Sequence, residues 1–361
     1  FKWAFLFNRM KNKTSRLLWI SILPQLLFIY YIRRNPEWVE SSYSEKFYPL
    51  VSKLHRGFFN LFPFSAGDIL YFFMIVFSIR YFYKFFTAEV KKPLHIVRDI
   101  GALVALISLL FHLSWGINYH RKPLNEQMGM GIKYDQTDLE NTLNDLITKS
   151  NELHLSLVGI DSLAIDFPYS KMELFEKAVS FDPLTNNQLE GIHKVKKSLF
   201  SLPLTYMGYS GYLNPLTLEA QVNSKIPKIS FITTILHETA HQMGYASEKE
   251  ANFIAFFSAI NSEDPYVQYA GYTFATRYCY GDLLIADREK AIEMIGNLNL
   301  GIVKNIRAVN RFWVGYKNPL RPVFKKTYDG YLKANGQKSG IVSYNEMVGL
   351  VINHQKKSIK E

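Results

Sequence analysis

Two histidines four residues apart flank a glutamate in the segment I-L-H-E-T-A-H-Q-M-G at residues 235–244. On a helix, this spacing places the imidazoles of His237 and His241 on one face. Zn²⁺ binds neutral imidazole nitrogens at about 2.0–2.1 Å, and such a pair supplies two of them. Glu238 lies beside the pair, where its carboxylate could take a proton from a metal-activated water and return it to a leaving amine. The pattern therefore predicts a catalytic zinc site.

A catalytic zinc site uses a third protein ligand and keeps its fourth position for water. The segment Y-A-S-E-K-E-A-N that follows offers two carboxylates, Glu248 and Glu250. Ser247 and Glu250 have the spacing of a capping box, which would start a second helix at Ser247 and occupy Glu250. We therefore predict Glu248 as the third ligand, with Glu250 as the alternative. Asn252, one turn above Glu248, is predicted to accept the free N–H of a ligating histidine.

The HExxH run at residues 237–241, followed by E-x-x-A-N at residues 248–252, resembles the glutamate zincins. The resemblance implies a zincin-like metallopeptidase fold in which a glutamate on a following helix completes the metal site. The chain also resembles an uncharacterised family of bacterial membrane proteins that carry this signature behind several N-terminal spans. Gly244 resembles the glycine in the HExxHxxG turn of metzincins. Ser247 stands where their third histidine would be, so metzincin ligation is not carried over.

The elements around the motif must hold it in place. Residues 231–243 are predicted to be a helix, with Ser230 as its N-cap and Gly244 as its stop. Residues 202–223 are broken by glycine and proline and suit strands and turns. Such a strand could receive a peptide substrate along its edge, or it could simply cover the core. The oxyanion of the reaction could be stabilised by a nearby tyrosine hydroxyl, and the candidates are Tyr206, Tyr209, Tyr212 and Tyr245.

The rest of the C-terminal part is helical by periodicity, so the predicted fold class is α+β and mainly helical. Helices are expected at residues 138–153, 170–179 and 188–200, and after the motif at 253–260, 266–280, 288–295, 303–316 and 323–335. Ser343 and Glu346 form a possible capping box for a last helix that reaches to about residue 356. Cys279 is the single cysteine, which excludes internal disulfides and a cysteine-based zinc site.

Charge and hydropathy divide the chain into two parts. Residues 1–134 hold 18 Lys and Arg against 7 Asp and Glu, whereas the remainder holds 24 of each sign. The excess lies beside apolar segments, which argues against nucleic-acid binding and favours a lipid bilayer as partner. Three transmembrane helices are predicted within a membrane domain of residues 1–130, at about residues 17–32, 62–79 and 100–117. A catalytic domain would then occupy residues 131–361.

The basic flanks of these segments predict their orientation. With the N-terminus in the cytoplasm, the cytoplasmic side receives Lys2, Arg9, Lys11, Lys13 and Arg16, together with Arg80, Lys84, Lys91, Lys92 and Arg98. Three spans would then place the C-terminal domain outside the cytoplasm, on a multi-pass protein of the inner cell membrane. Residues 43–59, between the first two spans, mix basic and apolar side chains. They could form a helix on the lipid headgroups or one packed against the soluble domain.

We therefore expect a membrane-anchored zinc metallopeptidase that hydrolyses a peptide or protein of the cell envelope. Two alternatives stay open. The domain could be a metal-stabilised, inactive module that senses envelope components, or a zinc hydrolase of a non-peptide envelope substrate. Glu238 argues against the inactive module, because a structural zinc site needs no base and prefers four closed ligands.

Overall fold

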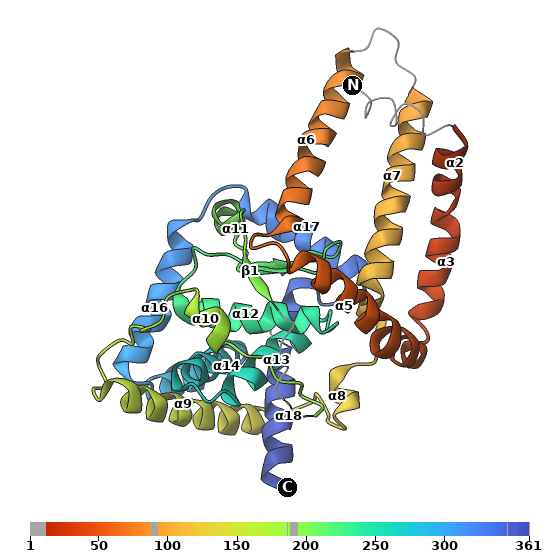
Figure 1. Ribbon diagram of the computed structural model, residues 1–361. Coiled ribbons are helices and arrows are strands. Elements are labelled where there is room, and N and C mark those ends of the chain that lie inside the picture. The colour runs from red at the N-terminus through yellow and green to blue at the C-terminus, as the bar shows by residue number, and fades with distance from the viewer. Residues whose placement is uncertain (1–11, 88–92, 186, 188–193, 345, 361) are drawn as a thin grey trace.

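Helices dominate the computed structural model, which describes residues 12–87, 93–185, 187, 194–344 and 346–360. This confirms the mainly helical class. Figure 1 shows apolar helices rising from one side of a helical body that holds the predicted zinc motif near its centre. Several residues of the orientation argument lie outside the described part of the chain, namely Lys2, Arg9, Lys11, Lys91 and Lys92.

Three helices are long and apolar enough to cross a membrane, at Thr14–Ile32, Ala66–Thr87 and Val97–Ser114. The first consists of α2 (Asn12–Ile20) and α3 (Ile22–Ile32), the second is α6 (Ala66–Thr87), and the third lies in α7 (Pro93–Ser114). The number of candidate spans among the described residues is as predicted, but their bounds differ. The second extends to residue 87, because its aromatic end stays helical. The third ends at Ser114, because Trp115 leaves the α-helix and the 3₁₀ turn η2 (Gly116–His120) follows.

The chain between the first two spans packs against the body on one face and is open on the other. It contains α4 (Pro36–Trp38), the π-helix η1 (Val39–Phe47) and α5 (Tyr48–Phe59). Tyr43 and Tyr48 are buried, and the Tyr48 hydroxyl donates to the carbonyl oxygen of Gln242 at 2.8 Å. Leu50 and Leu54 are exposed on the opposite face. The buried face supports the predicted packing against the body. The exposed apolar face is compatible with the other alternative, contact with lipid headgroups.

The body consists mainly of helices, and two of the longest begin at clear capping residues. The capping box of α9 is formed by Asp135 and Asp138, and Gly159 ends this helix with a φ of 71°. Asp264 caps α14 by accepting two backbone N–H groups. The helices are α8 (Leu124–Gln127), α9 (Gln136–Val158), α10 (Glu173–Lys177), α14 (Pro265–Ala286), α15 (Arg288–Ile295), α16 (Leu300–Gly315), α17 (Arg321–Ala334), η3 (Gly340–Tyr344) and α18 (Met347–Lys360).

A three-stranded sheet covers one side of the motif helix. Its order is β1 (Val195–Lys197), β3 (Ala220–Val222), β2 (Gly211–Leu213), with β1 parallel and β2 antiparallel to β3. The predicted helix at residues 188–200 is therefore wrong over β1, where the backbone pairs with β3. Residues 188–193 lie outside the described part. The predicted strand region is right for β2 and β3, but Ser201–Met207 forms the short helix α11.

The motif helix α12 (Lys228–Gln242) is the centre of the core. Every residue from Phe231 to Gln242 is buried, and α13 (Glu248–Ile260), α14 and the sheet surround it. The helix begins before the predicted N-cap, because Pro227 precedes its first turn and Ser230 already lies inside it. The predicted stop is right. Gly244 has a φ of 90°, a left-handed conformation that favours glycine.

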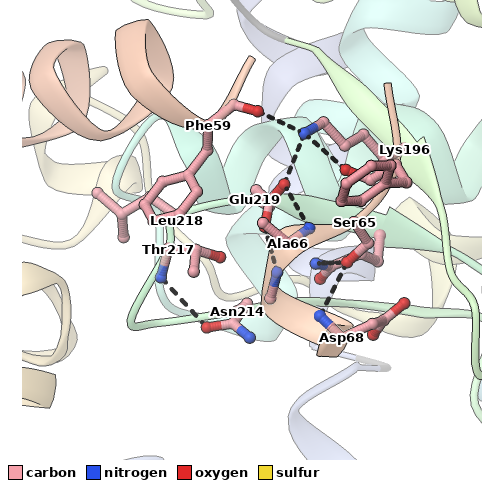
Figure 2. Close-up of polar contacts among 12 residues, drawn as sticks. Phe59, Ser65, Ala66, Asp68, Lys196, Asn214, Thr217, Leu218 and Glu219 are labelled. Atoms are coloured by element: carbon pink, nitrogen blue, oxygen red, sulfur yellow. Dashed lines mark hydrogen bonds and ion pairs between the residues drawn. The ribbon is translucent and has the colours of Figure 1, made fainter. Parts of the chain in front are cut away.

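The first turn of the span α6 is bound to the sheet by buried polar groups, as Figure 2 shows. The Glu219 carboxylate accepts the backbone N–H groups of Ala66 and Gly67 at 3.2 and 2.6 Å and the Lys196 ammonium at 2.6 Å. A carboxylate at a helix N-terminus is favoured by the exposed N–H groups there. Asp68 accepts the Leu199 N–H at 2.6 Å and so binds the helix beside β1. The candidate membrane helix and the sheet are therefore held together by buried polar contacts.

We expect Lys196→Met to destabilise the protein strongly. The side chains of Lys196 and Glu219 are 4% and 2% exposed, so the variant would leave a buried carboxylate without its cation. Removing one partner of such a pair costs about 3–5 kcal/mol. Thermal unfolding in detergent should show a clearly lower midpoint. Lys290→Met, in the exposed pair with Glu293, is the matched control and should show no measurable change. Equal midpoints for the two variants would contradict this assignment.

Candidate metal site

Helix α12 and the start of α13 bring three potential metal ligands together. His237, His241 and Glu248 are buried, and one ligand atom from each lies within 4.8 Å of the others. Glu248 Oε2 is 3.2 Å from Nε2 of His237 and 3.6 Å from Nε2 of His241. The left-handed turn at Gly244 reverses the chain, so that Glu248 returns to the face of α12 that carries the histidines. This is the arrangement that the spacing predicts.

The second nitrogen of each imidazole is held by an oxygen acceptor. Nδ1 of His237 lies 2.8 Å from Oδ1 of Asn252, and Nδ1 of His241 lies 2.7 Å from the carbonyl oxygen of Tyr245. Because both partners accept, each Nδ1 carries a hydrogen, and each Nε2 faces Glu248 as the atom available to a metal ion. Asn252 thus lies where the sequence places it, and its Nδ2 donates to the Tyr278 hydroxyl at 3.3 Å. Such partners orient ligating histidines.

The two candidate carboxylates face different directions. Glu250 Oε1 accepts the backbone N–H of Leu124 at 2.8 Å and lies outside the metal-ligand group. The helix does start after Ser247, but no side chain caps it, so the predicted capping box is absent at this position. Glu250 is still occupied, by the segment that follows the third span. Of the two alternatives, the structure brings Glu248 to the histidines.

Glu248 is further held by a residue that no local sequence pattern marks. The Tyr328 hydroxyl, from α17, donates to Glu248 Oε1 at 2.7 Å. The other carboxylate oxygen, Oε2, is buried and has no hydrogen-bond partner among the described residues. A buried carboxylate oxygen without a donor is costly. The two converging Nε2 atoms and this oxygen form a donor set of the kind that binds zinc, so the residues fit the ion that the motif implies.

Charges within the cluster shift the pKa values of its members. Burial tends to lower the pKa of His241, but the nearby Glu248 carboxylate outweighs it and raises that pKa to about 9. Burial tends to raise the pKa of Glu248, and the two imidazoles hold it well below its usual range instead. Both shifts favour a positive charge beside the Glu248 carboxylate, and a divalent cation would supply one.

Glu238 lies between the two histidines on α12 and has an environment of its own. It is buried, and its Oε2 has no hydrogen-bond partner among the described residues. Burial is the largest influence on it and raises its pKa to about 7. Gly211 of β2 lies against this carboxylate, since a Cβ at that position would be 2.7 Å from Glu238 Oε1. A carboxylate with a pKa near neutrality can both accept and release a proton.

The end of the third candidate span packs against the end of the motif helix. The Trp115 indole N–H donates to the carbonyl oxygen of His241 at 3.0 Å, and the indole ring lies edge-on to the imidazole. The polar contacts of Trp115, Tyr48 and Leu124 all cross residue 130, where the sequence suggests a domain boundary. That boundary stays a prediction. The membrane-side segments nevertheless help to position α12 and α13.

A cavity of about 1960 Å³ opens onto the cluster. Its lining includes all four predicted site residues of the motif, namely His237, Glu238, His241 and Glu248, together with Asn252. Among the tyrosines considered for the oxyanion, Tyr209 and Tyr212 line it. Their hydroxyls donate to the Phe324 carbonyl oxygen and to the Asp68 carboxylate. Because these donors are used elsewhere, the geometry gives no support to an oxyanion role for either.

Comparison with known proteins identifies a family but no activity. A family model described as "Protein of unknown function (DUF3810)" matches residues 43–352. The searches of curated proteins and of solved structures gave no match. The match covers the spans after the first, the motif helix and most of the C-terminal helices. It agrees with the expectation of an uncharacterised family, and the resemblance to glutamate zincins stays a prediction.

Proposed function

The chain belongs to the DUF3810 family, and we propose that it is a zinc metallopeptidase anchored in a membrane by its apolar helices. The observation that carries the proposal is the convergence of His237 Nε2, His241 Nε2 and Glu248 Oε2, with a separate buried carboxylate from Glu238 beside them. Three protein ligands with an additional base are typical of catalytic rather than structural zinc sites.

A bound zinc ion would supply a Lewis acid that acidifies a water and polarises a substrate carbonyl. The chain's own residues would do the remaining work. Asn252 and the Tyr245 carbonyl keep Nδ1 of both histidines protonated, so that Nε2 is available to the ion. Glu238 would accept the proton of the attacking water on its carboxylate and deliver it to the departing amine. Burial assists this exchange, because it brings the pKa of Glu238 close to neutrality.

The sheet offers a place for an extended peptide. Strand β2 is an outer strand of the sheet, and Gly211, Tyr212 and Leu213 line the same cavity as the cluster. A peptide that adds beside an edge strand gains main-chain hydrogen bonds and presents its carbonyls in register. Gly211 has no side chain to separate such a peptide from Glu238. This geometry favours peptide hydrolysis over hydrolysis of a non-peptide substrate.

Removal and return of the metal test the proposal. The full chain in detergent is incubated with a peptide library as purified, after a zinc chelator, and after zinc is added back. We expect cleavage that the chelator abolishes and zinc restores. Cleavage that persists without metal, or none under any of the three conditions, would contradict the proposed activity.

We also propose that the metal site lies on the extracytoplasmic side of the inner cell membrane. The support is the odd number of candidate spans and the basic flanks of the first and second of them. Reporter enzymes fused after Gly131 and near Glu361 should be active only outside the cytoplasm. Activity of both fusions in the cytoplasm would reverse the orientation.

A further inference from the structure

The cavity at the cluster continues along the second membrane helix. One face of α6 lines it, with residues that recur every three or four positions: Tyr71, Met74, Ile75, Ser78, Ile79, Phe82 and Tyr83. The distance along the helix from Tyr71 to Tyr83 is about 18 Å, more than half of a hydrocarbon core about 30 Å thick. This face of α6 forms one wall of the cavity. A site that bound only a soluble peptide would have no need of such a wall.

The same cavity is bounded by the end of the third span and by the cluster itself. Phe111, Trp115 and Tyr119 line it from the region where α7 ends, and His237 and Glu248 line it from the body. Figure 1 shows α6 standing apart from α7, with α17 crossing near their lower ends. Because α6 is fixed to the sheet through Glu219 and Asp68, this wall is held in place relative to β2. The cavity therefore connects the lipid-facing part of the protein with the proposed catalytic groups.

We propose that the substrate is a peptide that carries a fatty acyl anchor, and that its acyl chain lies against α6 while its peptide reaches the cluster from the bilayer. This inference rests on the proposed function, because it names the substrate class of the same site. The volume of about 1960 Å³ is roughly twice the upper size of an ordinary small-molecule pocket. It has room for a peptide segment and an acyl chain together.

The chemistry of the wall favours an acyl chain over a polypeptide. Between Tyr71 and Tyr83 the wall presents Met74, Ile75, Ile79 and Phe82, and the Ser78 hydroxyl donates to the carbonyl oxygen of Met74 in its own helix at 2.7 Å. An extended peptide on this wall would leave backbone N–H and C=O groups without partners. A transmembrane segment would have to unwind there to reach β2. An acyl chain has no such groups and gains from every methylene that is buried.

Two sets of probes test the inference with the full chain in phosphatidylcholine vesicles. One is a library of N-palmitoylated decapeptides, and the other holds the same sequences with an N-acetyl group. We expect cleavage of the palmitoylated set with a kcat/KM at least tenfold higher. Ile75→Trp or Ile79→Trp, which fill the wall, should remove this advantage. Val76→Trp is the matched control on α6 outside the cavity lining, and should keep it.

Equal cleavage of the two sets would overturn the inference and leave the proposed peptidase intact. Preferential cleavage of a third library, of transmembrane peptides without acyl groups, would likewise overturn the inference and leave the proposed peptidase intact. Zinc content and elution volume of the Ile75→Trp and Ile79→Trp variants must match the wild type, so that a loss reports the wall and not misfolding.

A binding measurement separates this inference from the activity. Glu238→Gln protein is irradiated with a palmitoylated peptide that carries a photoreactive group near the end of its acyl chain. Cross-links should fall on the cavity-lining face of residues 71–83. They should disappear when Ile75→Trp is added to the Glu238→Gln protein. If neither library is cleaved by the wild type, the proposed function fails and the cross-links still decide where the chain binds. Cross-links absent from that face, or spread equally to Val76 and Phe77, would overturn the inference.

Discussion

The Glu238→Gln variant should keep its zinc and its fold. Its kcat for peptide hydrolysis should fall by about 10²–10⁴-fold. Glu238 is separate from the three converging ligand atoms, so its replacement leaves the donor set complete. The amide cannot accept the proton that the attacking water must lose. The hydrogen-bond partners of His237 and His241 come from Asn252 and Tyr245 and are unaffected by the substitution.

The effect of Glu238→Gln also separates an enzyme from a binding module. Envelope peptides are compared between cells that express wild type and variant, with equal zinc content established in both. A substrate that accumulates only with the variant would support the peptidase and identify its target. Identical peptide profiles across growth conditions would favour a module that binds without turnover.

Glu248→Gln should weaken zinc retention by more than about 100-fold, and Glu250→Gln should change it little. Loss of a group that supports a ligand typically costs about 10–100-fold in metal affinity, and loss of a ligand carboxylate should exceed that. Glu248 Oε2 faces both histidines, whereas Glu250 accepts the Leu124 N–H. The carbonyl oxygen of a glutamine at position 250 can still accept that hydrogen bond, so Glu250→Gln is a matched control for a buried charge two residues away.

Competition with a zinc chelator measures both variants of this pair. The ratio of their apparent affinities is the decisive quantity, because any general loss of stability from a buried amide is shared. If Glu250→Gln loses zinc first, Glu250 is the ligand and α13 must adopt a different rotation from the one described.

Local spacing was enough to predict the candidate site, because its parts lie within sixteen residues of one another. The i, i+4 histidines, the turn at Gly244 and the position of Asn252 all depend on helix geometry and on one tight turn. The structure brings Glu248 rather than Glu250 to the histidines, but the stated reason was wrong, since Glu250 accepts the Leu124 N–H and does not cap the helix. The existence of three apolar helices followed from composition in the same way.

Contacts between distant parts of the chain could not be predicted from the sequence. Tyr328 contacts Glu248, which lies 80 positions away in the sequence, and Trp115 contacts His241, which lies 126 positions away. No local pattern marks either residue, because single aromatic residues within helices and at helix ends are commonplace. Strand β1 was missed for a related reason. Its three residues are defined by pairing with β3, and their own propensity does not distinguish them from the helix expected there.

The metal content and coordination of the protein test the proposed zinc site most directly. Elemental analysis and zinc-edge X-ray absorption are applied to the full chain purified without chelator. We expect one zinc per chain, two imidazole nitrogens at about 2.0–2.1 Å, a carboxylate oxygen at about 2.0–2.2 Å and no sulfur. His237→Ala and His241→Ala should each remove the ion. A wild-type protein without stoichiometric zinc, or zinc that both variants retain in the same coordination, would contradict the central claim.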